Sequence, residues 1–257
     1  MPALERDGRT LAYRLADRGD GGPTCLFVHG SGADRRVWKA QDRLAREFRV
    51  VAVDLPGHGD STDIETDAGP ETLATYARDV AAVAGTVDAD VLVGNSLGGA
   101  IVQWLLIEGL YEPAGAVLVG SGAKLAVRGD LREWLATDFE RVIEFLHGPN
   151  RLFADPEPAM VEASKAAMRA CGRRVTERDY LTCHEFDVRA DLEAIAVPTL
   201  AVGGRLDELT PPRYHTYLAE HIPDGRVEFV EDAAHMVMLE RPRRLNRLLR
   251  SFTAEVA

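Results

Sequence analysis

Cysteine is scarce in this chain, and the pattern of the cysteines argues against a small fold held together by disulfides or structural zinc. Only Cys25, Cys171 and Cys183 are present. Their odd number and irregular spacing suit neither a set of disulfides nor a structural zinc site. We therefore expect a protein of a reducing compartment, the cytoplasm, with no bound metal.

Long hydrophobic runs and an excess of positive charge are also absent. No apolar stretch approaches the ~18 residues of a membrane span, and residues 1–8 lack the apolar core of a signal peptide. The 30 Lys and Arg residues are outnumbered by 41 Asp and Glu residues, for a net charge of −11. Because a negative surface repels phosphate backbones and anionic lipids, the composition argues against binding to nucleic acids or membranes.

The sequence does contain enough apolar material for a large core. Of its 257 residues, 46% are hydrophobic and 28% are charged, which is the balance of a globular protein. A chain of this length buries roughly 70–75% of the surface of its unfolded state, so it needs no metal or disulfide to stay folded.

Short apolar segments alternate with helical patterns along most of the chain. The strand-like segments are mostly continuously apolar and lie at 24–28, 50–53, 91–93, 116–119, 199–202 and 227–230. The helical patterns between and after them lie at 36–47, 71–85, 97–108 and 241–256. This alternation predicts an α/β fold with a mostly parallel sheet and helices on both faces.

The alternation is interrupted once. Residues 124–189 show no strong strand, but contain amphipathic helical stretches at 131–146, 158–170 and 176–189. We interpret residues 124–189 as a helical cap, or lid, inserted into a core made of residues 1–123 and 190–257. The alternative is that these helices belong to the core itself.

Ser96 has the sequence context of a catalytic nucleophile. Residues 94–98 read Gly-Asn-Ser-Leu-Gly, directly after the apolar segment 91–93 and directly before a helical pattern. Gly-x-Ser-x-Gly between a strand and a helix is the context of a nucleophile elbow. Such a turn exposes the serine hydroxyl near a helix N-terminus, where developing negative charge is stabilised. The alternative is a chance match in a glycine-rich chain.

A serine nucleophile needs a base, and the chain has seven histidines. His235 lies in a short turn after the predicted strand at 227–230, at the sheet edge where ligands bind in open α/β folds. An acid must orient its imidazole and stabilise the charged ring. Asp207 lies just after the predicted strand at 199–202, and its neighbour Glu208 is the alternative acid.

Two backbone N–H groups are candidates for an oxyanion hole. Ser31 lies in a His-Gly-Ser-Gly loop after a predicted strand, and Leu97 follows Ser96 directly. Their N–H groups are fixed in place before negative charge develops on the substrate, which makes them effective donors. We expect His29, Asp54 and His58 to hold loops in place, with a functional role for Asp54 or His58 as the alternative.

Taken in chain order, these motifs resemble the α/β-hydrolase family. The resemblance rests on the elbow, the His-Gly-Ser-Gly loop and the segments 54–61, 203–207 and 234–242. It covers nearly the whole chain and is weakest in the cap. It implies an eight-stranded sheet with a lid, a triad of Ser96, Asp207 and His235, and no cofactor. A serine nucleophile distinguishes the chain from haloalkane dehalogenases and epoxide hydrolases, which use aspartate.

The expected activity is hydrolysis of a carboxylic ester of a small, largely apolar substrate through an acyl-enzyme intermediate. Met236 opens an apolar turn that suits a hydrophobic acyl or alcohol group, because Met adapts to irregular shapes; core packing is the alternative. The elbow is also similar to that of carbon–carbon bond hydrolases of ring-cleavage products, although residues 32–34 and 236–239 depart from their usual pattern. A lactonase or enol-lactonase, a thioesterase and a slow-turnover ligand receptor on the same fold are further alternatives. The sequence leaves the oligomeric state open.

Overall fold

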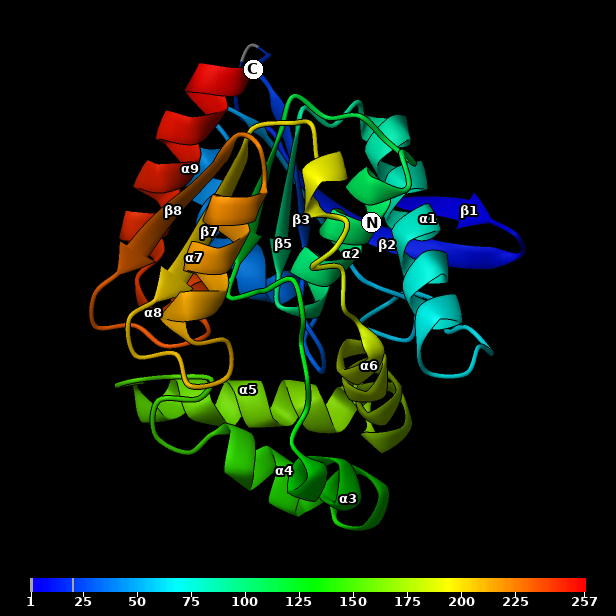
Figure 1. The fold of residues 1–257 in the computed structure, drawn as a ribbon. Helices are drawn as coiled ribbons and strands as arrows, with labels where there is room; N and C mark the ends of the chain where they lie inside the picture. Colours follow the sequence, from blue (N-terminus) through cyan, green and yellow to red (C-terminus); the bar gives the residue numbers. More distant parts are fainter. Residues whose placement is uncertain (1, 20) are drawn as a thin grey trace.

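The strands of the protein form one eight-stranded, mostly parallel sheet. A computed structural model describes residues 2–19 and 21–257, and its strands are ordered β1-β2-β4-β3-β5-β6-β7-β8 across the sheet (Figure 1). Neighbouring strands from β4 to β8 are parallel, whereas β1 and β2 pair antiparallel at one edge. The strands are β1 (Ala3–Arg6), β2 (Arg9–Ala16), β3 (Thr24–Val28), β4 (Arg49–Val53), β5 (Val91–Asn95), β6 (Gly115–Val119), β7 (Thr199–Gly204) and β8 (Gly225–Val230). This sheet confirms the predicted fold class.

The burial of the central strands explains why the sequence revealed them. Every residue of β3, β5 and β6 is buried, so these strands read as continuous apolar runs. In β1 the residues alternate between exposed and half-buried. Its four residues, Ala-Leu-Glu-Arg, therefore carry no strong strand signal, and β1 and β2 were absent from the predicted segments.

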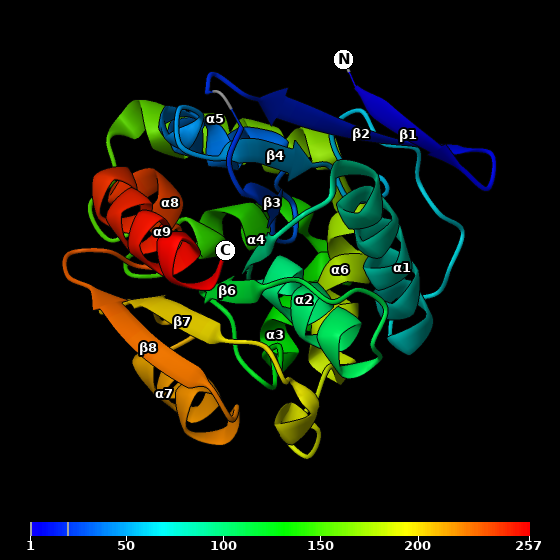
Figure 2. The same cartoon turned by 90° about the horizontal axis from the view of Figure 1, so that it is seen from above.

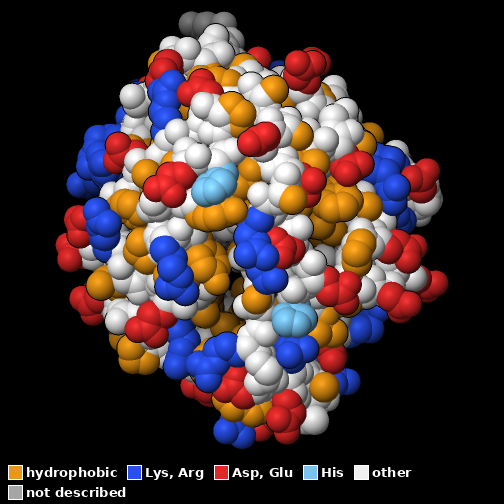
Figure 3. Space-filling model, in the orientation of Figure 1, with side chains coloured by type: hydrophobic (Ala, Val, Ile, Leu, Met, Phe, Trp, Pro, Cys, Tyr) orange, Lys and Arg blue, Asp and Glu red, His pale blue; other side chains and the backbone are white. Residues whose placement is uncertain are grey.

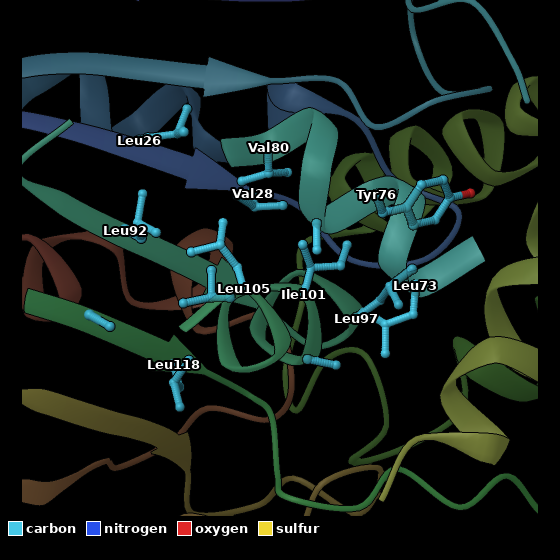
Figure 4. Close-up of a cluster of buried hydrophobic side chains, with 14 of the residues drawn as sticks. Leu26, Val28, Leu73, Tyr76, Val80, Leu92, Leu97, Ile101, Leu105 and Leu118 are labelled. Carbon is cyan, nitrogen blue, oxygen red and sulfur yellow. The ribbon is translucent and has the colours of Figure 1, made fainter. Parts of the chain in front are cut away.

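Helices cover both faces of the sheet (Figure 2). One apolar core joins the sheet to α1 (Pro70–Val87), α2 (Leu97–Ile107) and α7 (Pro212–His221). Side chains from β3, β5, β6, α1 and α2 converge there, as Figure 4 shows. The other face packs against three further elements: η1 (Arg35–Leu44), α8 (Val237–Glu240) and α9 (Pro242–Val256).

The first predicted helical pattern, at 36–47, coincides with a helix, but that helix ends earlier. It is a 3₁₀ helix, η1, which ends at Leu44. The N–H of Val37 bonds to Asp34 O and that of Ala45 to Asp42 O. These three-residue spacings are those of the tighter 3₁₀ turn.

Residues 124–189 form four helices that lie together beyond the ends of the strands, at the bottom of the view in Figure 1. An isolated bridge between Lys124 and Asp187 joins the two ends of this segment. The helices are α3 (Gly129–Thr137), α4 (Phe139–Leu146), α5 (Pro158–Cys171) and α6 (Arg173–Glu185), and a short η2 (Leu192–Ala194) follows. None of the helices in the described part of the chain is long and apolar enough to cross a bilayer.

Two predicted helices in this segment need correction. The stretch 131–146 is not one helix, because the side chain of Asp138 accepts a hydrogen bond from the N–H of Arg141 and begins α4 there. The stretch predicted at 176–189 begins earlier, at Arg173, and ends at Glu185. It ends there because Phe186 is extended, with φ −68° and ψ 118°.

Candidate active site

Ser96 lies at a sharp turn between β5 and α2. Its backbone has φ 54° and ψ −116°, a conformation that is strained for any residue except glycine. The N–H of Ser96 donates to Val119 O at 3.0 Å, and Ser121 Oγ donates to Ser96 O, also at 3.0 Å. Hydrogen bonds to β6 and the residues that follow it therefore hold the turn in its strained conformation.

The glycines around Ser96 are required by close backbone contacts. A Cβ atom on Gly94 would lie 2.3 Å from Gly98 O, and a Cβ atom on Gly98 would lie 2.4 Å from Val28 O. Both distances are far below van der Waals contact, and in each case the obstacle is backbone rather than a movable side chain. The Gly-x-Ser-x-Gly pattern is thus explained by the packing of β5, α2 and β3 at this turn.

His235 and Asp207 are brought together from the loops after β8 and β7. His235 Nδ1 lies 2.8 Å from Asp207 Oδ2, and both side chains are buried. Burial alone would raise the pKa of Asp207, but the charge of His235 and hydrogen bonds from Thr210 lower that pKa below its ordinary value. Asp207 is therefore ionised at neutral pH. Because Nδ1 of His235 faces Asp207, Nε2 is the ring nitrogen left for another partner.

Thr210 completes the surroundings of Asp207, and the sequence did not point to it. Its hydroxyl donates to Asp207 Oδ2 at 2.7 Å, and its oxygen lies 3.2 Å from His235 Nδ1. The N–H groups of Leu209 and Thr210 donate to Asp207 Oδ1 at 2.8 and 2.9 Å. Both carboxylate oxygens of Asp207 therefore have hydrogen-bond partners, which fixes the orientation of the carboxylate. The only sequence signal that could have pointed to Thr210 was its position three residues after Asp207.

Glu208, the alternative acid, is exposed. No contact joins its side chain to His235 among the described residues; its backbone N–H donates to Asn150 O at 2.8 Å. The next two residues after Asn150 bond to the histidine loop, because His235 N donates to Arg151 O at 3.2 Å and Met236 N to Leu152 O at 2.9 Å. Residues 150–152 therefore connect both loops directly to the 124–189 segment.

The loop that carries Ser31 lies against the Ser96 turn. A Cβ atom on Gly30 would lie 3.0 Å from Ser96 Cβ, so the two turns are in contact. His29 Nδ1 donates to Gly30 O at 2.8 Å, and its Nε2 accepts the N–H of Leu55 at 3.0 Å. Burial and the neighbouring His58 lower the pKa of His29 to about 3, so His29 is a neutral group that ties two loops together. The N–H of Leu97 belongs to the first residue of α2, where the helix supplies no partner.

Two cavities open from Ser96, and we name them the larger arm and the smaller arm. Ser31, Ser96, Tyr180 and His235 line both. The larger arm, of about 590 Å³, is mostly apolar and is bordered by Met236 and by small and Met side chains of α5. The smaller arm, of about 270 Å³, runs toward α3, α4 and the start of α7. Ser96 and His235 therefore face the same space, with separate room on either side of them.

Within the described residues, no group of three or more His, Cys, Asp or Glu side chains is arranged to hold a metal ion. The hydroxyl-bearing Ser96 and the imidazole of His235 line a forked cavity, and the buried carboxylate of Asp207 contacts that imidazole. A nucleophile, a base and an orienting acid in this relation are suited to acyl transfer.

Comparisons with known proteins show which sequence family the chain matches. Residues 25–248 match the sequence model of the alpha/beta hydrolase family. The chain is 31% identical over 244 residues to a pimeloyl-[acyl-carrier protein] methyl ester esterase of Neisseria meningitidis serogroup C, covering 90% of this chain and 93% of that protein.

Two solved structures are similar over nearly the whole chain. The structure of a thermophilic esterase is 29% identical, with a TM-score of 0.86 and coverage of 100% of this chain and 98% of that chain. The structure of an N-acyl homoserine lactone degrading enzyme is 25% identical, with a TM-score of 0.85 and coverage of 98% and 100%.

Proposed function

Because the chain belongs to the alpha/beta hydrolase family, we propose that it is a serine hydrolase that cleaves carboxylic esters of small, largely apolar substrates. The observation that carries the proposal is the 2.8 Å contact between His235 Nδ1 and Asp207 Oδ2, beside a strained Ser96 that faces the same cavity. The similarity to esterases supports this choice among acyl-transfer reactions.

In the proposed mechanism, Ser96 Oγ attacks the ester carbonyl while His235 Nε2 takes its proton. Asp207 stabilises the imidazolium that forms. The N–H groups of Ser31 and Leu97 donate to the oxyanion of the tetrahedral intermediate. His235 then gives the proton to the leaving alcohol, which departs and leaves an acyl group on Ser96. Water, deprotonated by His235, attacks this acyl-enzyme and releases the acid.

Residues 124–189 are proposed to act as the cap of this site. Their helices supply much of the wall of both arms, and the hydrogen bonds of Arg151 O and Leu152 O to the histidine loop attach them to the catalytic centre. The mostly apolar larger arm, with Met236 at its border, is proposed to hold the uncharged part of the ester. The three cysteines are free thiols, which supports a cytoplasmic location.

Lactone hydrolysis is a second candidate, because a lactone is a cyclic ester and one similar structure is that of an N-acyl homoserine lactone degrading enzyme. The same residues would act, and the ring alcohol would remain attached to the acyl group. Turnover of an N-acyl homoserine lactone against turnover of open-chain butyrate esters separates the two substrate classes.

The proposal is tested with Ser96→Ala and a neutral aryl ester such as 4-nitrophenyl butyrate. We expect this variant to fold normally, to lose at least about 10³-fold in kcat and to escape labelling by a fluorophosphonate, which should add one equivalent to the wild type. Ser251→Ala, which removes an exposed hydroxyl of α9, is the control and should be labelled and active. Labelling of Ser96→Ala, or no turnover of any ester by the wild type, would overturn the proposal.

A further inference from the structure

The two arms of the site differ in charge. Apart from His235, the charged residues that line the smaller arm are three arginines and one glutamate: Arg128, Arg151, Arg213 and Glu208. In the larger arm, Arg36 and Asp34 are the corresponding residues, and they pair with each other at 2.5 Å. The smaller arm is therefore positively charged in a chain whose net charge is −11, whereas the charges of the larger arm cancel.

Arg151 is held rigidly next to the catalytic centre. Its guanidinium carbon lies 3.7 Å from the centre of the Phe145 ring, and its Nη1 donates to Phe145 O at 2.5 Å. Its own carbonyl oxygen accepts the N–H of His235. Among the described residues, no carboxylate lies within ion-pair distance of Arg151. Arg151 is thus a half-buried cation without a carboxylate partner in the part of the chain that the structure describes, and its backbone is hydrogen-bonded to that of His235, the proposed base.

Two further arginines border the same arm. Arg128 also contacts the Phe145 ring, at 5.2 Å from its centre, and its charge is balanced by Asp130 at 2.6 Å. Arg213 lies over the Tyr214 ring at 5.2 Å, and the described part of the chain places no carboxylate within ion-pair distance of it. Figure 3 shows a hollow near the centre of this face, with apolar side chains inside it and Lys or Arg side chains around it.

We propose that the smaller arm binds a carboxylate on the substrate, with Arg151 as its principal partner and Arg213 as a second cation. The preferred substrates are then esters that carry a free carboxylate on one side of the ester bond and an apolar group on the other. This inference rests on the proposed ester hydrolysis and names the substrate class of the same site.

The chemistry of the arm favours a carboxylate over a neutral polar group. A guanidinium forms paired, charge-assisted hydrogen bonds with a carboxylate, and its planar shape allows both oxygens to bind at once. Phe145 orients Arg151 in advance, so less conformational entropy is lost on binding. The cavity of about 270 Å³ is also bordered by protein on several sides, which reduces screening by solvent.

The test compares esters that differ only by a carboxylate and its neutral carboxamide. Monomethyl adipate is paired with the same methyl ester ending in a carboxamide, which places the charge on the acyl side. Carboxymethyl butyrate is paired with its carboxamide, which places the charge on the alcohol side. The measured quantity is the ratio of kcat/KM for carboxylate over carboxamide, with rates followed by pH-stat titration.

For at least one pair, we expect the wild type to prefer the carboxylate, and Arg151→Met to lower that ratio about tenfold. Arg151→Lys keeps a charge and should recover part of the ratio. Arg141→Met is the matched control, because Arg141 also stacks on an aromatic ring, Trp134 at 4.1 Å, but lines neither arm. It should leave the ratio at its wild-type value.

A measurement on the wild type alone guards against misfolded variants. The carboxylate preference should fall when NaCl is raised from 50 to 500 mM, because salt screens the attraction to the arginines. If neutral esters are hydrolysed but no carboxylate preference exists, or if Arg151→Met and Arg141→Met have the same ratio as the wild type, the carboxylate site is overturned and the hydrolase assignment stands. If the wild type hydrolyses no ester at all, both proposals fall.

Discussion

His58 Nε2 lies 3.0 Å from Asp179 Oδ2, and neither side chain is exposed to solvent. His58 belongs to the loop after β4, whereas Asp179 belongs to α6 of the 124–189 segment. Burial alone would lower the pKa of His58, but the attraction of Asp179 outweighs it and raises the pKa well above its ordinary value. A buried ion pair therefore joins the proposed cap to the core.

The first prediction is that Asp179→Asn destabilises the protein most at low pH. His58 titrates near 6.5 in the unfolded chain and at a higher pH in the folded one. Its contribution to stability is thus fully present below about pH 6.5 and is lost as pH rises through the folded pKa. We expect a loss of about 3 kcal/mol in the free energy of unfolding at pH 6 and a smaller loss at pH 9, measured by urea denaturation.

The control for this prediction is Asp224→Asn, which removes an exposed partner of Arg226 at 3.5 Å. Exposed pairs contribute at most about 1 kcal/mol, so this change should have little effect at either pH. If Asp179→Asn lowered the free energy of unfolding equally at pH 6 and pH 9, His58 would not be charged in the folded protein.

The second prediction separates the two candidate acids. Asp207→Asn should lower kcat by up to about 10⁴-fold, because an amide at this position favours the wrong imidazole tautomer. Glu208→Gln should change kcat much less, since Glu208 is exposed and the carboxylate that lies 2.8 Å from His235 Nδ1 is that of Asp207. Steady-state kinetics with 4-nitrophenyl butyrate measures both, and a larger effect at Glu208 would reassign the acid.

The third prediction concerns Thr210 as a positioning residue. Thr210→Val removes the hydroxyl that donates to Asp207 Oδ2 at 2.7 Å while keeping a similar shape. One lost hydrogen bond to a charged acceptor corresponds to about 1.5–3 kcal/mol, so kcat/KM should fall at least about tenfold. Thr210→Ser keeps the hydroxyl and should retain most of the activity. A purely structural role would instead lower stability and leave the kinetics of the folded fraction unchanged in both variants.

Much of the core could be predicted from the sequence because its signals are local. The strands β3, β5 and β6 are buried along their whole length, and a strand with two covered faces is apolar at most positions. The Gly-x-Ser-x-Gly pattern could also be interpreted, because a Cβ atom on Gly94 would meet Gly98 O only four residues along the chain. The contact of Gly98 with Val28 O, by contrast, joins segments that are far apart in the sequence. Predicting that the loops of Asp207 and His235 lie at one sheet edge needed only the rule that parallel strands end on the same side.

The remaining features depend on contacts between distant segments. A single capping residue, Asp138, divides a continuous apolar pattern into α3 and α4, and periodicity alone does not reveal such a break. The pair His58–Asp179 and the bond from His235 N to Arg151 O both join the core to the 124–189 segment. Their existence depends on how the helices of that segment dock, which no local pattern encodes. The charged smaller arm was missed for the same reason.

The last prediction compares two glycine substitutions with opposite expected signs. In Gly94→Ala, the added methyl group would lie 2.3 Å from Gly98 O and 2.6 Å from Gly99 N. Both atoms are backbone at the start of α2, so the helix itself must shift, and we expect a loss of at least about 3 kcal/mol in the free energy of unfolding. In Gly85→Ala, the methyl group would meet no atom within 4 Å on an exposed position of α1. Alanine loses less backbone entropy than glycine in a helix, so this variant should gain about 0.5–1 kcal/mol. Urea denaturation of both variants at pH 7 measures the two changes. Wild-type stability in Gly94→Ala would show that the strand and helix around Ser96 are not packed as closely as these distances require.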